Sequence, residues 1–492
     1  MHSLALLTVA VLSLQPVQTE SLTPLPVDLA PYQEVILKDE IQIGTIQVTR
    51  QTSAWNLPRG STRYSREMQL RLTRFGNPVA LRLVETEDRM PKGEIQSLGM
   101  RQYQGSRQLF NLQGTMTGDR MRVIIEGNRE AVVPFNLQTY GPLGREFALA
   151  QRNWKIGDVC SFQAYLPVVN RVTPIQVMAK KAEGVLNSVL AVEMTPGKIV
   201  AGEQSLQLPT VTFFLDENQN ILVTKTELEG IGEVLLVRNF RNGNSKSPLE
   251  SFDIGKAALI PLNRKIPAAK SSLKVAYKII PLNRGAQAPE VPQDFRQTIQ
   301  TNAKGELTLE VRAFRTPGDI PASPPPRAEE MAPSKFLDWD QPSVRLLANN
   351  LAKREMDPWR KAVFLESLVR QRMTFDNQAQ LASASEIAFR PRGDCRHAAL
   401  LLSALLRVEE IPSRVVHGLI YVEKNGLPFM GFHMWTEAYV RGVWIPLDGT
   451  VGLGFVAADH VKISHHTYAG VESLAPMAAV QPFIGKIKME VE

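Results

Sequence analysis

The stretch "RGDCRHAALLLSALLR" (residues 392–407) contains one of only two cysteines in a chain of 492 residues. Asp394 is a residue type that caps helix N-termini, so a helix is expected to begin at Cys395 and to run through about Val408. The residues after the cysteine leave little polar surface, which predicts a helix at the centre of a domain. A thiol in the first turn faces the positive end of the helix dipole, which favours its reactive thiolate form. The position of the cysteine therefore indicates a nucleophile.

A thiolate nucleophile needs a base and a group that orients the base. Residues 413–450 predict three strands separated by two short turns. His433 lies on the middle strand and Asp448 ends the third, and a hairpin between these strands places the two side chains near each other. Together with Cys395 they predict a Cys-His-Asp arrangement.

This part of the chain closely resembles the transglutaminase-like superfamily, whose core is a papain-type cysteine fold. The resemblance covers roughly residues 336–465 and implies that Cys395 is the nucleophile, His433 the general base and acid, and Asp448 the residue that orients the histidine. It further implies acyl transfer through a thioester. The matching pieces are Gly393-Asp394-Cys395, the helix "AALLLSALLR" (398–407), "IPSRVVHGL" (411–419), His433-x-Trp435-x-Glu437 and "WIPLDGT" (444–450).

Two positions depart from the family pattern without removing a reacting group. Gly449 stands where a proline is common, and Met434 where a smaller residue is common. The fold would supply the backbone N–H of Cys395 to the oxyanion. Gln378 and Gln380 are the candidate side-chain donors.

Other polar residues near the motif have structural interpretations. His397 lies two residues from Cys395 and points elsewhere on the helix, and Glu437 is expected to pair with a cation. His465 and His466 are expected at the surface of a loop-like tail. No metal and no cofactor is expected, because closely paired ligands such as Cys-x-x-Cys are absent. The candidate metal ligands in this region are Asp394, Cys395, His397, His417 and His433.

The segment from about 22 to 314 predicts mainly strands. Apolar and polar residues alternate in "MQLRLT" (68–73), and turn residues at 216–220 predict a hairpin within 210–226. Gly44 changes the phase of a strand, which predicts a bulge. Residues 147–153 predict one of few helices. We expect a large curved antiparallel sheet that divides near residue 245.

Six prolines between Pro317 and Pro333 mark the main domain boundary, after which the hydrophobic period becomes helical. The predicted fold class is α+β multidomain, with a large, mainly antiparallel β region followed by a transglutaminase-like α+β domain. The expected divisions are a signal peptide (1–20), a β-rich domain (21–245), a second β-rich segment (246–314), a Pro-rich linker (315–335) and the transglutaminase-like domain (336–492).

The composition and the N-terminal sequence indicate where the protein is located and which partners are expected. The net charge is +7, but Lys and Arg are scattered, so no nucleic-acid partner is expected. Leu4–Leu14 has the length of a signal-peptide core and predicts export to the periplasm or the extracellular space. No stretch of about 20 apolar residues predicts a transmembrane helix. Cys160 is interpreted as a small buried hydrophobe in a strand.

Two hypotheses of function follow. The first is an exported acyl-transfer enzyme that acts on amide or carboxamide groups of a protein or peptide substrate, by cross-linking, deamidation or peptide hydrolysis. The alternative is a non-catalytic envelope or extracellular binding or scaffold protein with a relic cysteine fold. The reactivity of the Cys395 thiol distinguishes the two hypotheses.

Overall fold

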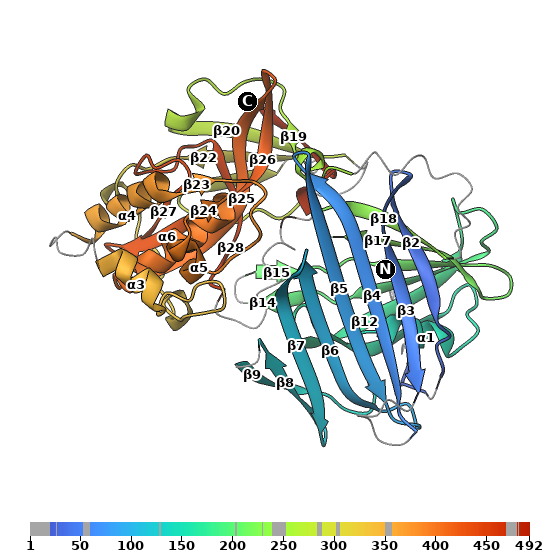
Figure 1. Cartoon of the computed structure of the whole chain (residues 1–492). Coiled ribbons are helices and arrows are strands. Elements are labelled where there is room, and N and C mark those ends of the chain that lie inside the picture. The colour runs from blue at the N-terminus through green and yellow to red at the C-terminus, as the bar shows by residue number, and fades with distance from the viewer. Residues whose placement is uncertain are drawn as a thin grey trace, which may run out of the picture.

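The computed structural model has a curled β-sheet built by the N-terminal half and a mixed domain built by the C-terminal part (Figure 1). The predicted signal peptide lies almost wholly outside the described residues. The structure describes residues 20–25, 27–52, 60–126, 129–201, 204–228, 230–238, 252–282, 288–301, 306–349, 357–468, 480 and 482–492.

The N-terminal sheet has 16 strands and is antiparallel except where β1 and β10 flank β11. A short helix, α1 (Gly144–Ala150), follows β10, and a separate hairpin joins β14 (Ile199–Ala201) to β15 (Gln204–Leu206). In sheet order the strands are β1 (Glu20–Ser21), β11 (Val159–Leu166), β12 (Arg171–Lys181), β13 (Leu190–Pro196), β16 (Val211–Leu215), β17 (Ile221–Leu228), β18 (Gly232–Arg238), β2 (Tyr32–Lys38), β3 (Ile41–Thr52), β4 (Thr62–Arg74), β5 (Asn77–Arg89), β6 (Ile95–Gln104), β7 (Arg107–Thr117), β8 (Arg120–Ile125) and β9 (Arg129–Pro134), with β10 (Thr139–Tyr140) beside β11.

The sheet curls, so that residues from its two halves share one core. Leu70 on β4 belongs to the same buried cluster as Val177 on β12 and Phe213 on β16. Strand twist, accumulated over many neighbours, gives a long sheet this curvature. The prediction of a large curved antiparallel sheet is confirmed.

Local predictions for this sheet also hold. Leu70 and Leu72 on β4 are buried, as the alternation in 68–73 requires. The strands β16 and β17 form a hairpin around Asp216, whose side chain accepts hydrogen bonds from the backbone of the turn. The register between β2 and β3 shifts opposite Gly44, which is the predicted bulge.

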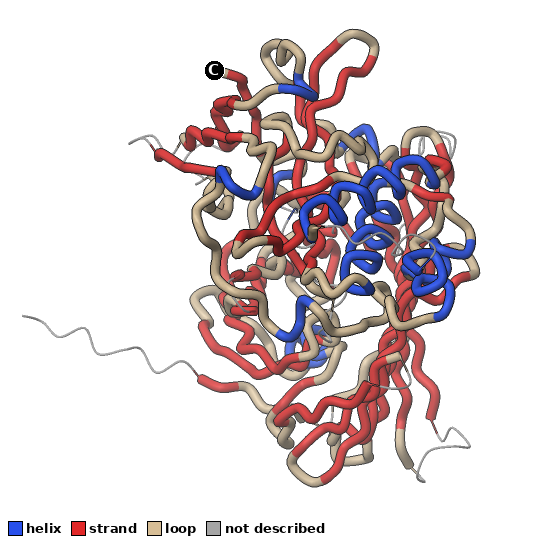
Figure 2. The backbone as a smooth tube through the Cα atoms, turned by 90° about the vertical axis from the view of Figure 1, so that its left-hand side faces the viewer, coloured by secondary structure: helices blue, strands red, loops and turns tan. Residues whose placement is uncertain are grey.

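In the C-terminal domain α6 packs against a five-stranded sheet and α3, α4 and α5 pack on α6, and Figure 2 shows the helices gathered in one part of the molecule. The central helix α6 lies on β26, where Thr436 Oγ1 donates a hydrogen bond of 3.0 Å to the carbonyl of Ala399. A two-stranded ladder joins β23 (Thr374–Phe375) to β24 (Arg392–Gly393). The helices are α3 (Pro342–Asn349), α4 (Pro358–Arg372), α5 (Ala384–Phe389) and α6 (Cys395–Val408), and the sheet holds β19 (Ile260–Pro261), β26 (Leu427–Val440), β25 (Ser413–Lys424) and β28 (His460–His466), with β27 (Val443–Leu447) beside β26.

The described residues between 260 and 312 pack mainly with the C-terminal domain, whereas α2 (Ile254–Ala257) lies against β4 of the N-terminal sheet. After α2, β19 joins the domain's sheet. A second sheet combines β21 (Gln297–Thr301), β22 (Leu307–Arg312), β20 (Lys274–Pro281) and the C-terminal β29 (Ile487–Val491). The Pro-rich segment 315–335 runs along the same domain, where the carbonyl of Ala332 accepts a hydrogen bond from Arg407.

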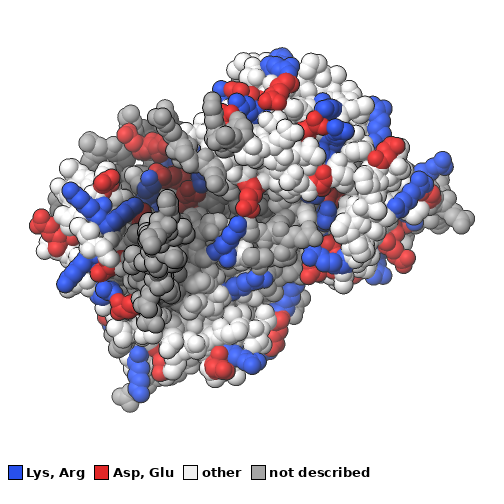
Figure 3. Space-filling view, turned by 180° about the vertical axis from the view of Figure 1, so that it is seen from behind, with Lys and Arg blue, Asp and Glu red and all other residues white. Residues whose placement is uncertain are grey.

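On the face shown in Figure 3, basic and acidic side chains are interspersed. This face therefore shows no large patch of basic side chains, although the whole chain has a net charge of +7. No helix among the described residues combines the length and the apolar character needed to cross a membrane.

The burial of α6 predicts a large stability effect from its core leucines. Leu402 is fully buried, whereas Leu346 on α3 is 61% exposed. Leu402→Ala should lower the free energy of unfolding by about 2–5 kcal/mol, because it removes transfer energy and leaves a cavity. Leu346→Ala is the matched control and should change it by about 0.5 kcal/mol or less. Urea unfolding measures both, and equal effects would contradict the central position of α6.

Candidate active site

The helix that carries Cys395 begins where the sequence predicts, and Asp394 is its N-cap. The Asp394 carboxylate accepts a hydrogen bond of 3.0 Å from the backbone N–H of Arg396. Gly393 is required by close packing, because a Cβ atom there would lie 2.2 Å from Cγ of His397. The Gly-Asp-Cys order thus sets the entry of the chain into α6 and leaves Cys395 in its first turn.

Three cationic or imidazole side chains surround the Asp394 carboxylate. Arg396 bonds both of its oxygens at 3.0 Å, Arg74 from the end of β4 contacts it at 2.8 Å, and His397 Nδ1 lies 3.0 Å away. Burial favours the neutral acid, but the hydrogen bond from His397 and the charges of Arg396 and Arg74 hold the pKa of Asp394 well below its usual range. The cap is therefore a fixed negative charge.

His433 and Asp448 are in direct contact, as the hairpin predicts. His433 Nε2 lies 2.8 Å from Asp448 Oδ2, and both side chains are buried. Burial opposes a charge on the imidazole, but the Asp448 carboxylate outweighs burial and, with a hydrogen bond to Cys395, raises the pKa of His433 to about 10. Since Nε2 is used by Asp448, Nδ1 is the nitrogen left for the thiol.

Cys395 is half-buried and lies at the edge of the C-terminal core. The indole of Trp435 stacks against the imidazole of His433, with ring centroids 6.2 Å apart. Trp435 is fully buried and forms the wall behind His433. A thiol with partial access beside a shielded imidazole has the features of a reactive cysteine site.

The loop that carries Asp448 is held from three sides. The backbone N–H of Asp448 donates a hydrogen bond to Glu366 Oε1 at 2.8 Å. Oε2 of the same glutamate accepts one from the backbone N–H of Gly454 at 2.6 Å. The other carboxylate oxygen of Asp448 accepts hydrogen bonds from the backbone and hydroxyl of Thr450. Burial outweighs the two backbone donors and raises the pKa of Glu366 to about 8.

His460 is a second imidazole at the Asp448 carboxylate. Its Nε2 lies 3.3 Å from Asp448 Oδ2, and its Nδ1 lies 2.5 Å from Asp459 Oδ1. His460 begins β28, which brings its side chain beside His433 from a different strand. The donors of His433, Asp448 and His460 lie within 4.8 Å of one another, and imidazole and carboxylate are ligand types that zinc accepts.

The structure places the other predicted residues away from the thiol. Gln378 Nε2 donates to Asn77 at 2.6 Å, and Gln380 Nε2 lies against Gly105, so both amides face the N-terminal sheet. Neither side chain is positioned as an oxyanion donor. His397 Nε2 bonds the carbonyl of Gln380 at 2.8 Å, which fits its structural interpretation.

Glu437 pairs with two cations, as expected. Lys462 Nζ lies 2.7 Å from one oxygen and Arg414 Nε 2.7 Å from the other. The interpretation of His465 and His466 as an exposed tail is wrong, because both lie in β28 and are partly buried. Burial lowers the pKa of His466 to about 4. The two adjacent histidines carry no periodic signal by which the sequence would reveal a strand.

The charge state of His433 predicts a pH-dependent stability effect. Because its pKa in the folded state, about 10, lies above the ordinary 6.5, its protonation stabilises the fold fully below pH 6.5, and this contribution is lost as pH rises toward 10. His433→Gln should therefore lower the free energy of unfolding more at pH 6 than at pH 10. Urea unfolding across this range measures the difference. An equal loss at both ends would contradict the charged His433–Asp448 pair.

Glu366 predicts an effect on the Asp448 loop. In Glu366→Gln one carboxyl oxygen, which can accept a hydrogen bond whether or not the acid is ionised, becomes an amide nitrogen that cannot accept the backbone N–H. The lost acceptor should cost about 1–3 kcal/mol of unfolding free energy. Gln371→Glu on the same helix α4 is an exposed control and should have little effect. Unfolding by urea at pH 7 compares the two variants.

Comparison with known proteins gives a family for the C-terminal domain. Residues 345–449 match the model of the transglutaminase-like superfamily. No curated protein matches the chain.

Three similar solved structures share 12–18% sequence identity with the chain. A candidate cysteine protease from Cytophaga hutchinsonii has 16% identity and a TM-score of 0.28, and the match covers 45% of this chain and 86% of that one. The periplasmic domain of TgpA from Pseudomonas aeruginosa, bound to ethylmercury, has 18% identity and a TM-score of 0.26, with 40% and 83% covered. A β-barrel-like protein of the DUF1849 domain from Brucella abortus has 12% identity and a TM-score of 0.31, with 43% and 97% covered.

These TM-scores are low, so the interpretation of the site rests on the family match and on the side-chain geometry. The matched segment contains α6, β26 and β27, which carry Cys395, His433 and the residues leading to Asp448. The C-terminal part of this chain is a transglutaminase-like domain.

Proposed function

We propose that this protein is an exported transglutaminase-like enzyme that transfers acyl groups from amide or carboxamide substrates. Cys395 is the proposed nucleophile, His433 the base and acid, and Asp448 the residue that orients the imidazole. The observation that carries the proposal is the hydrogen-bonded pair of Asp448 and His433 close to the thiol at the start of α6, whose charge acts on the imidazole. Protein or peptide side chains and backbones are the substrates that this chemistry fits.

The reaction divides into two steps. The Cys395 sulfur attacks the carbonyl carbon, and His433 Nδ1 holds the thiol proton. As the tetrahedral intermediate collapses, the C–N bond breaks and His433 delivers the proton to the departing amine or ammonia, leaving a thioester. In the second step His433 takes a proton from water or from an amine, which attacks the thioester and frees the thiolate. Water gives deamidation or hydrolysis, and an amine gives a cross-link.

Asp448 supports both steps by fixing the imidazole. Its bond to Nε2 keeps Nδ1 directed at sulfur and stabilises the imidazolium that forms when the thiol is deprotonated. Glu366, Thr450 and His460 fix Asp448 in turn. The backbone N–H of Cys395 is the proposed oxyanion donor, since the Asp394 side chain caps Arg396.

The two cysteines provide an internal test of the proposed nucleophile. Burial raises the pKa of Cys160 to about 11 and the side chain is fully buried, so iodoacetamide should label Cys395 and spare Cys160 in the folded protein. In His433→Gln, labelling of Cys395 at pH 6 should slow at least about tenfold, because the thiolate loses its counter-ion. Peptide mass spectrometry quantifies each site. Labelling of Cys395 that ignores His433 would favour the relic-scaffold alternative.

Catalysis itself is tested with two acceptors. Wild-type protein should release ammonia from a glutamine-containing protein such as casein, or incorporate a fluorescent amine into it. Cys395→Ala should abolish both reactions, and Asp448→Asn should reduce kcat by roughly 10³–10⁴-fold, as loss of the orienting group does in related triads. The matched control is Asp376→Asn. Activity that persists in Cys395→Ala, or that a chelator abolishes, would contradict a thiolate mechanism.

A further inference from the structure

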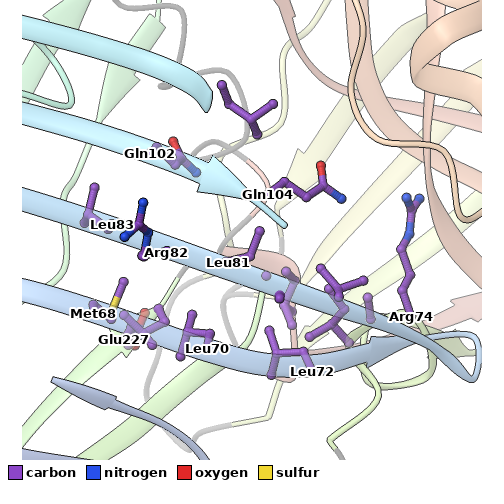
Figure 4. Close-up of a pocket in the computed structure, with 18 of the residues that line it drawn as sticks. Met68, Leu70, Leu72, Arg74, Leu81, Arg82, Leu83, Gln102, Gln104 and Glu227 are labelled. Carbon is purple, nitrogen blue, oxygen red and sulfur yellow. The ribbon is translucent and has the colours of Figure 1, made fainter. Parts of the chain in front are cut away.

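A large apolar cavity occupies the concave side of the N-terminal sheet. Its volume is about 1360 Å³, more than the roughly 300–1,000 Å³ of common small-molecule sites. One wall is formed by β4 and β5, and Figure 4 shows side chains projecting from these strands. The labelled apolar residues of this wall are Met68, Leu70, Leu72, Leu81 and Leu83.

The other walls add further apolar residues to the lining. Val211, Phe213 and Leu236 line the cavity from β16 and β18. The C-terminal domain contributes Phe432 and Met434 from β26. Along β4 the lining runs from Arg66 to Arg74, which is roughly 26 Å at the rise of a strand. An elongated apolar molecule therefore fits this space better than a compact one.

Polar side chains line both ends of the cavity, including Arg74, Gln104 and Arg396 at the far end, and those at the Arg66 end form a compact cluster. Arg66 bonds Glu85 and Glu146, each at 2.5 Å. Arg145 lines the same space, and among the described residues no carboxylate lies within 4 Å of its guanidinium. Burial lowers the pKa of Arg145. The two arginines and two glutamates make this cluster formally neutral.

Within the described part of the chain, three buried polar atoms of the cavity lining have no hydrogen-bond partner. They are Arg145 Nε, Glu146 Oε2 and Thr224 Oγ1. Most buried polar groups in native proteins are satisfied, and leaving one without a partner costs about 1–3 kcal/mol. Arg145 Nε is an unmatched donor, and Glu146 Oε2 in the next residue is an unmatched acceptor. A ligand group that both accepts and donates hydrogen bonds would satisfy the two atoms.

We propose that this cavity binds a long-chain amphiphile whose hydrocarbon tail lies along β4 and β5 and whose polar head, of zero net charge, hydrogen-bonds to Arg145 and Glu146. A monoacylglycerol and a zwitterionic lysophospholipid share this chemistry. A fully anionic head would place a surplus negative charge beside Glu85 and Glu146, and a cationic head would approach Arg66 and Arg145. The site is separate from Cys395, His433 and Asp448, none of which lines the cavity.

Head-group selectivity tests the assignment on the full-length, delipidated protein. Probes with the same dodecyl tail and different heads are titrated by calorimetry below their aggregation concentrations: monolaurin, lauroyl-lysophosphatidylethanolamine, laurate and dodecyltrimethylammonium. We expect saturable binding of one or both of the first two, at least about tenfold tighter than the charged probes, since one satisfied buried group is worth a factor of this size. Laurate binding as tightly as both uncharged or zwitterionic probes would overturn the head-group assignment.

Matched variants locate the site. Leu81→Trp fills the space beside β5 and should weaken the best probe at least about tenfold, whereas Leu137→Trp, at a leucine that is 67% exposed, should not. Arg145→Gln should reduce the preference among heads, with Arg120→Gln on β8 as control. Cys395→Ala should bind normally, which separates this site from the proposed catalysis. Absence of saturable binding to wild type, or equal binding by Leu81→Trp, would overturn the proposal.

Discussion

The buried carboxylate of Asp394 is the constraint on which the candidate site depends. It caps α6, fixes the loop before the helix through His397, and accepts Arg74 from the N-terminal sheet. A buried charge is tolerated only when it is paired and hydrogen-bonded. Removing any one partner of Asp394 therefore lowers the stability of the fold, because the carboxylate stays buried with fewer bonds. The position of Cys395, one residue later, is therefore coupled to the docking of the N-terminal sheet through Arg74, which lies 320 residues before Asp394 in the chain.

The electrostatics of the site follow from burial around a second carboxylate. Asp448 is almost fully buried, and the shielding by Trp435 keeps water from screening its attraction to His433. The imidazolium is stabilised there at the expense of the neutral ring. Glu366 has a different role. It accepts hydrogen bonds from two backbone N–H groups of the loop, whereas Asp448 bonds an imidazole that can gain or lose a proton. Two acidic groups close together thus have separate roles that their surroundings determine.

Sequence was sufficient where the signal is local or periodic. The cap at Asp394, the apolar helix after it and the hairpin that joins His433 to Asp448 depend on residues within about sixty positions of one another, and the family resemblance spans the same stretch. Arg74 and Glu366 carry no such signal, because only tertiary packing brings an arginine and a glutamate to those loops. His460 has no local signal of a role, because it precedes the short alternating run 461–464 and reaches Asp448 only through the pairing of β28 with β25. The glutamines Gln378 and Gln380 point to the N-terminal sheet because that sheet supplies their contacts, which spacing alone cannot indicate.

The cavity and the candidate active site share one structural element, the contact between the two parts of the chain. Arg396 lines the cavity and also bonds Asp394, and Phe432 and Met434 line it on either side of His433 in sequence. A ligand that touches both the N-terminal sheet and these residues stabilises the docked arrangement in proportion to its affinity and concentration. The docked arrangement is the one in which Arg74 reaches Asp394. Occupancy of the cavity and order at the start of α6 are therefore linked by mass action, without any requirement that the ligand approach the thiol.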